Sequence, residues 1–143
     1  MLTKFWATHS LEGKNSRSIL GNFLRLEFAR NPGAAFSSFT GLTIFLTLLA
    51  IGALVAIIWY VPKISHPLWA LGFGSLTGGI CGNLADRLFR APGFMQGEVV
   101  DWIRLPNWPL FNVADSFIVT SVALMIFLSW RDIPIRTVVV EDE

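Results

Sequence analysis

Residues 111–130 read FNVADSFIVTSVALMIFLSW, an apolar segment in which Asp115 is the only charged side chain. The hydrocarbon core of a bilayer requires about 17–25 apolar residues of a helix, so the segment predicts a transmembrane helix. A second carboxylate, Asp101, precedes it in the frame Val99-Val100-Asp101-Trp102-Ile103. Ionisable side chains at or in a membrane are costly, and they mark a functional site by default.

The same apolar character extends through most of the chain. Residues 31–62 and 67–85 contain no Asp, Glu, Lys, Arg or His. Only 15% of the 143 residues are charged, against about 25% in soluble proteins, and the mean hydropathy is +0.57. We predict one membrane-embedded domain over residues 1–143, mainly helical, with transmembrane helices at 41–61, 67–86 and 111–130.

Several classes of function are excluded by composition. A net charge of +1 is too small for a nucleic-acid-binding face. Cys81 is the only cysteine, so an internal disulfide and a cysteine metal cluster are not expected. The N-terminal residues lack the apolar core of a secretory signal peptide. We expect no metal and no cofactor.

The polar segments are expected to lie together on one side of the membrane. Leu24, Leu26 and Phe28 alternate with polar neighbours, which predicts a half-buried strand over 22–30 that ends at the turn of residues 31–33. Residues 9–17 are expected to form a loop, and residues 97–103 to pair with the strand. Residues 1–40 and 87–110 would then form a small β platform.

Two features of the spans have more than one interpretation. Gly74, Gly78 and Gly82 recur at four-residue spacing, which favours close helix packing but also suits a passage for substrate or water. Eight of the eleven Lys and Arg residues lie in the platform segments. Taken alone, the positive-inside rule would place those segments in the cytoplasm.

Several polar residues gather at one membrane face. Asn83, Asp86 and Arg87 end the second span, and Asn112 and Asp115 share a face at the start of the third. Each alone is explained as a charged or capped helix end. If Asp101 folds back against the third span, two carboxylates meet and share a proton. One would activate a water molecule, and the other would donate a hydrogen bond to a carbonyl oxygen.

Four stretches in this order resemble the motifs of the lipoprotein signal peptidase (signal peptidase II) family. They are Ala29-Arg30-Asn31-Pro32-Gly33-Ala34-Ala35-Phe36, Gly78-Gly79-Ile80-Cys81-Gly82-Asn83-Leu84-Ala85-Asp86-Arg87, Val99-Val100-Asp101 and Phe111-Asn112-Val113-Ala114-Asp115. The resemblance implies a multi-pass aspartyl endopeptidase of the bacterial cytoplasmic membrane. It would remove the signal peptide from diacylglyceryl-modified prolipoproteins, cutting before the lipidated cysteine.

The resemblance also implies roles for individual residues. Asp101 and Asp115 match the catalytic dyad, with the active site near the extracytoplasmic face. Asn31, Asn83, Arg87 and Asn112 match residues that line or support the substrate site, and Asp86 falls in the same motif. The expected partners are prolipoprotein substrates and membrane lipid, with no nucleic acid, and the chain is expected to be a monomer.

The chain departs from the family pattern at its start. The family has four spans, and the first ends in Asp-x-x-Ser/Thr-Lys, of which Met1-Leu2-Thr3-Lys4 matches the last four positions. We therefore expect three spans here, without the first helix and its aspartate. Two alternatives follow: an inactive truncated form, and a non-enzymatic membrane protein that uses Asp115 as an intramembrane charge.

Overall fold

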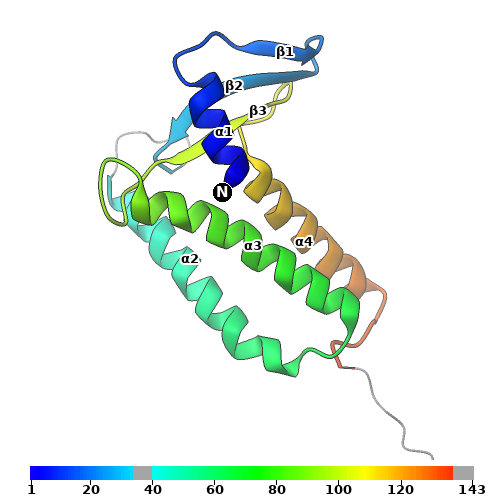
Figure 1. Ribbon diagram of the computed structural model, residues 1–143. Helices are drawn as coiled ribbons and strands as arrows, with labels where there is room; N and C mark the ends of the chain where they lie inside the picture. The colour runs from blue at the N-terminus through cyan, green and yellow to red at the C-terminus, as the bar shows by residue number, and fades with distance from the viewer. Residues whose placement is uncertain (34–39, 137–143) are drawn as a thin grey trace, which may run out of the picture.

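Three long helices carry a small sheet and a short helix at one end (Figure 1). The computed structural model of the chain describes residues 1–33 and 40–136. In chain order its elements are α1 (Leu2–Leu11), β1 (Arg17–Leu20), β2 (Leu24–Asn31), α2 (Thr40–Tyr60), the 3-10 turn η1 (Val61–Lys63), α3 (Pro67–Phe89), β3 (Val99–Arg104) and α4 (Val113–Trp130). The predicted class, mainly helical with a small β platform, is confirmed.

The three long helices coincide with the three predicted spans. Among the described residues, two helical segments are apolar and long enough to cross a membrane, Leu42–Lys63 with a mean hydropathy of 2.6 and Val113–Trp130 with 1.8. Helix α3 is longer than α4, but its glycines and the polar residues near its end lower its hydropathy. The number of spans and their orientation therefore stay predictions.

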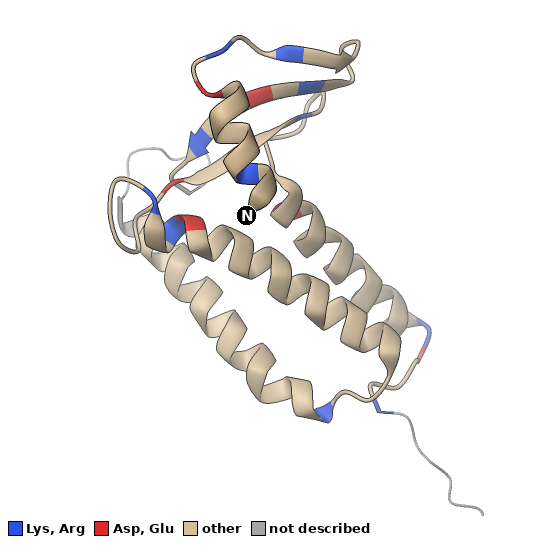
Figure 2. Ribbon diagram, viewed as in Figure 1, with Lys and Arg blue, Asp and Glu red and all other residues tan. Residues whose placement is uncertain are grey.

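Charge is distributed as expected for helices whose solvent is lipid. Lys, Arg, Asp and Glu lie towards the ends of the molecule, whereas the middle of each long helix is free of them in the described chain (Figure 2). Large apolar side chains such as Leu49, Ile58 and Ile126 are exposed on these helices. Apolar side chains in such numbers on an outer surface indicate a membrane-facing surface.

Helix α1 (Leu2–Leu11) corrects the expectation of a loop over residues 9–17, because residues 9–11 belong to the helix. Lys4, Ala7 and Leu11 are its buried residues, at the three- and four-residue spacing of one helix face. Ala7 and Leu11 pack with Val100 of β3 in a small hydrophobic core. The many polar side chains of the segment hid this short buried face. Residues 12–16 form the turn and loop that the sequence predicts, and the strand β1 follows.

The sheet has the order β1-β2-β3, with antiparallel pairing throughout. The predicted pairing of residues 22–30 with 97–103 is confirmed by the register, in which Ala29 lies opposite Asp101 and Asn31 opposite Val99. Residues 34–36 of the first motif lie outside the described residues. Strand β2 ends at the predicted turn, where Gly33 has φ 131°.

The connection from β3 to α4 folds back on β3. The backbone N–H of Ile103 donates to the carbonyl of Phe111 at 2.8 Å, and Phe111 N–H donates back at 3.1 Å. This two-way pairing brings the first residues of α4 next to β3. The third helix therefore begins at Val113 rather than at 111, and Asn112 becomes its N-cap.

Close packing of α3 against α4 depends on glycine at particular positions. A Cβ on Gly79 would lie 2.7 Å from the Ala114 carbonyl oxygen, and one on Gly82 would lie 3.0 Å from the Ala114 Cβ. Gly74 and Gly78 instead line an open cavity of about 500 Å³ between α1, α3 and α4. Close packing is thus found at Gly79 and Gly82, and Gly82 also lines the cavity. A passage for substrate or water stays a prediction.

These contacts predict opposite results at adjacent glycines. Gly79→Ala should destabilise the protein by about 1–3 kcal/mol, because the methyl group overlaps the backbone of α4. Gly78→Ala is the matched control, because a Cβ added at Gly78 would meet no atom of a described neighbour within 4 Å. It should be neutral or slightly stabilising, since alanine is the better helix former. Thermal unfolding in detergent compares the two, and equal melting temperatures would contradict this packing.

Candidate active site

Asp115 lies in the first turn of α4, where the backbone geometry of a helix start fixes it. Its Oδ2 accepts the backbone N–H of Asn112 at 2.9 Å, and the Asn112 Oδ1 accepts the N–H groups of Ala114 and Asp115 at 2.7 and 3.2 Å. This reciprocal arrangement is a capping box. The positive end of the helix dipole favours a carboxylate there.

Asp101 reaches the same place from β3. Only 3% of the residue is exposed. Its Oδ1 accepts the side-chain N–H of Asn112 at 2.7 Å, and its Oδ2 accepts that of Asn31 at 2.9 Å. Burial raises the pKa of Asp101 above its ordinary value, with repulsion by Asp115 adding to the effect and the two amide donors opposing it.

Asparagine side chains join the two carboxylates. Asn83, on α3, donates to the Asp115 Oδ1 at 2.6 Å, and its own Oδ1 accepts a second N–H of Asn112 at 3.1 Å. Asn112 is fully buried and contacts Asp101, Asn83 and Asp115 at once. The structure thus brings five of the residues named from the sequence into one network: Asn31, Asn83, Asp101, Asn112 and Asp115.

Asp86 stands beside this network and anchors the surrounding elements. Its side chain is fully buried and forms ion pairs at 2.6 Å with Lys4 and with Arg90. Its Oδ2 also accepts the backbone N–H of Val100, next to Asp101, at 3.0 Å. Asp86 therefore ties α1 and β3 to the end of α3, which is a supporting position rather than a place among the two carboxylates.

Arg87 is adjacent to the network but differently engaged. The charges of Asp101, Asp115 and Asp86 all act on its guanidinium group. Its Nε is buried and has no hydrogen-bond partner among the described residues. A buried donor without a partner is costly, and here it leaves a cationic group with unused donor capacity beside the two aspartates.

Lys4 and Arg90 belong to the site but were not expected there. Lys4 lies about 80 positions before its partners in sequence, and Arg90 follows the second quoted motif, which ends at Arg87. The available signal for Lys4 was its match to the terminal Lys of the family's first-span motif. For Arg90 it was the four-residue spacing from Asp86, which places both on one helix face.

An apolar hollow adjoins the more exposed aspartate. A cavity of about 280 Å³ lies against Asp115 and includes Trp108, Phe111 and Val119 in its lining. Among the described residues, no three His, Cys, Asp or Glu side chains are grouped so that they could hold a metal ion. This end of the molecule brings together two carboxylates, their amide donors and a neighbouring apolar space.

Fold and site together define a membrane protein with paired carboxylates at one end of its apolar helices. Residues 1–131 match the family model of signal peptidase (SPase) II. The chain therefore belongs to the signal peptidase II family.

Similar proteins support this assignment. The lipoprotein signal peptidase of Rhodococcus jostii is 46% identical over 129 residues, which cover 90% of this chain and 65% of the relative. That of Leifsonia xyli is 44% identical over 133 residues, covering 92% and 62%. The chain thus spans somewhat less than two thirds of the length of these curated relatives.

Solved structures give the same result for the fold. One bacterial membrane enzyme superimposes with a TM-score of 0.79 at 27% identity, covering 99% of this chain and 85% of its own. Another superimposes with a TM-score of 0.80 at 28% identity, covering 92% and 84%.

The raised pKa of Asp101 predicts how stability changes with pH. In the unfolded chain this carboxyl ionises near pH 4, but in the folded protein it ionises at higher pH. Wild-type stability is therefore lost as the pH rises from about 4 through the raised pKa. Asp101→Asn removes this loss, so its melting temperature should rise relative to wild type between pH 4 and pH 8. A constant difference across that range would contradict the assigned burial.

Asp86 should be far more important for folding than an exposed acidic partner. Asp86→Asn leaves the buried Lys4 charge unpaired and should cost about 3–5 kcal/mol. Glu27→Gln is the matched control, because Glu27 pairs with Arg104 at 3.1 Å on the surface. It should cost about 0–1 kcal/mol. Chemical or thermal unfolding of both variants measures the difference, and similar costs would contradict the buried ion pair.

Proposed function

We propose that the protein is an aspartyl endopeptidase that removes the signal peptide from diacylglyceryl-modified prolipoproteins. The observation that carries this proposal is the pair Asp101 and Asp115, joined through Asn112 at one end of apolar helices. Membership of the signal peptidase II family and the names of the relatives support the substrate class. The scissile bond would be the peptide bond before the lipidated cysteine.

The two aspartates take different parts in the proposed reaction. Asp101 is the more deeply buried and has the raised pKa, so it holds the proton and donates a hydrogen bond to the scissile carbonyl oxygen. Asp115 acts as the carboxylate and accepts a proton from water, whose oxygen attacks the carbonyl carbon. The amide donors keep both side chains in place for this step.

Collapse of the tetrahedral intermediate completes the proposed reaction. The C–N bond breaks, and the proton taken up by the dyad passes to the departing nitrogen. The products are a signal peptide with a new carboxylate and a lipoprotein with a free amino group on its lipidated cysteine. Water is the only co-reactant, and no covalent enzyme intermediate forms.

The surroundings suit a lipid-bearing substrate. The apolar hollow against Asp115 adjoins α4, one of the two strongly apolar helices. We propose that the lipidated end of the substrate approaches Asp115 along this face while its acyl chains stay in the bilayer. Arg87, on which the charges of both aspartates act, is proposed to contact the substrate backbone.

We further propose that α2, α3 and α4 all cross the membrane as a monomeric domain, with the sheet and residues 87–110 outside the cytoplasm. The common end of these helices carries the sheet (Figure 1). Asp101 in β3 and Asp115 in the first turn of α4 lie at the same end. A signal peptide that has entered the membrane presents its cleavage region at that outer face. This placement runs against the count of basic residues, and cysteine labelling of the β1–β2 turn from outside intact cells tests it.

Replacing either aspartate tests the function itself. Asp101→Asn and Asp115→Asn should each lower kcat by about 10²–10⁴-fold or more, because each removes one half of the acid–base pair. The measurement is cleavage of a lipidated prolipoprotein in detergent–lipid micelles, followed by gel shift or mass spectrometry.

The matched control for these variants is Asp132→Asn. Asp132 is exposed in a turn after α4 with φ 52°, a conformation that asparagine tolerates well. The Asp132→Asn variant should cleave the prolipoprotein at the wild-type rate. Full activity of either dyad variant would refute the proposed function, and it would favour a non-enzymatic role for Asp115.

A further inference from the structure

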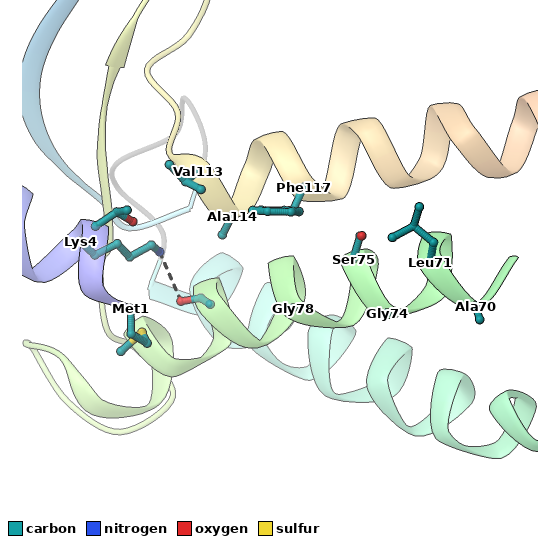
Figure 3. A pocket seen from close by; sticks show the side chains of 12 residues that line it. Met1, Lys4, Ala70, Leu71, Gly74, Ser75, Gly78, Val113, Ala114 and Phe117 are labelled. Carbon is teal, nitrogen blue, oxygen red and sulfur yellow. Dashed lines mark hydrogen bonds between the residues drawn. The ribbon is translucent and has the colours of Figure 1, made fainter. Parts of the chain in front are cut away.

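Lys4 makes contacts that the proposed chemistry does not by itself require. Lys4 is only 2% exposed. Its ammonium group donates to the Asp86 Oδ2 at 2.6 Å, the Asn83 Oδ1 at 2.7 Å and the Gly82 carbonyl at 3.3 Å. The side chain extends from α1 towards α3, and the contact with Gly82 is drawn in Figure 3. All three ammonium donors are thus used within the protein.

The contact with Asn83 bears on the dyad because an amide has two unlike ends. An ammonium group can only donate, so the Asn83 oxygen must face Lys4. The Asn83 nitrogen then faces Asp115 and donates to its Oδ1 at 2.6 Å. Turned the other way, the amide would place its oxygen against a carboxylate oxygen. The orientation of Asn83 therefore decides whether Asp115 receives a donor.

A second donor also holds this orientation, but it is weaker. The Asn112 side chain donates to the Asn83 Oδ1 at 3.1 Å. Its own orientation is fixed, since its oxygen caps α4 through Ala114 and Asp115. Lys4 is charged and closer to the Asn83 oxygen, and charge-assisted hydrogen bonds are about twice as strong as neutral ones.

We propose that Lys4 is a positioning residue of the two-aspartate site, which orients the Asn83 amide so that its N–H faces Asp115. This role goes beyond balancing the charge of Asp86. The same ammonium also meets the Asp86 oxygen that accepts the Val100 N–H. Lys4 thus contacts Asn83, which donates to Asp115, and also Asp86, which binds the backbone next to Asp101. The effect on catalysis rests on the proposed function, whereas the orientation of Asn83 does not.

The competing explanation is that Lys4 only neutralises Asp86. The two explanations are distinguished by comparing Lys4→Met with Lys4→Gln, each combined with Asp86→Asn. Both double variants lack the buried Lys4 and Asp86 charges, and both lose the Arg90 ion pair equally, so the comparison between them is unaffected. Glutamine keeps an N–H donor one bond shorter than lysine, and methionine keeps none. If a double variant fails to fold, the two single variants give the same comparison with Asp86 unchanged.

The first readout is independent of activity. In the full chain labelled with ¹⁵N-asparagine in detergent micelles, NMR follows hydrogen exchange of the Asn83 side-chain amide, assigned by its loss in Asn83→Ser. Loss of its hydrogen bond should speed exchange about 10- to 100-fold in the methionine variant. The glutamine variant should stay near wild type. Lys14→Met, which removes an exposed lysine that donates to the Ser10 carbonyl at 2.8 Å, should change nothing.

The second readout is kcat per folded molecule on a lipidated prolipoprotein. We expect a fall of about 10-fold or more for the methionine variant, recovery with glutamine, and KM values close to wild type. Equal exchange rates in the methionine and glutamine variants would overturn the proposal. If wild type does not cleave, the proposed function fails, and the exchange comparison still decides the role of Lys4.

Discussion

Two carboxylates, one of them buried, are brought together, and N–H donors on asparagine side chains make this arrangement stable. Asp101 is almost completely buried and is repelled by Asp115, so its charged form is disfavoured. Asn112 offsets part of this cost, because it caps α4 with its oxygen and donates to Asp101 with its nitrogen. One side chain thus serves both the start of the helix and the placement of the dyad.

The remaining parts of the fold keep this junction assembled. Gly79 allows α3 and α4 to approach closely, which places Asn83 beside the first turn of α4. The pairing of Ile103 with Phe111 brings β3 to the same point, and Asp86 fastens β3 to α3 through the Val100 N–H. Burial of Asp101 favours its neutral acid and lowers the stability of the fold when this side chain is charged. The contacts named above offset that cost.

Much of this architecture could be predicted from the sequence. Uncharged stretches located α2, α3 and α4, because lipid excludes charge over a fixed length. Alternation located β2, and the quoted motifs named the residues that meet at the dyad. Helix α1 was not found, since its buried face is short and includes Lys4. The Lys4–Asp86 pair joins segments remote in sequence, and no periodicity reports such a contact. Whether α3 crosses the membrane stays a prediction, because the glycines that permit close packing also lower the hydropathy of this helix.

In the proposed mechanism the two aspartates activate water and do not attack the substrate themselves. A single-turnover reaction in H₂¹⁸O, with enzyme in excess over a lipidated prolipoprotein, tests this directly. Mass spectrometry of the released signal peptide should find one ¹⁸O in its new carboxylate in the first turnover. A first-turnover peptide without ¹⁸O, together with ¹⁸O in Asp101 or Asp115, would show attack by a carboxylate and would rule out the activated-water mechanism.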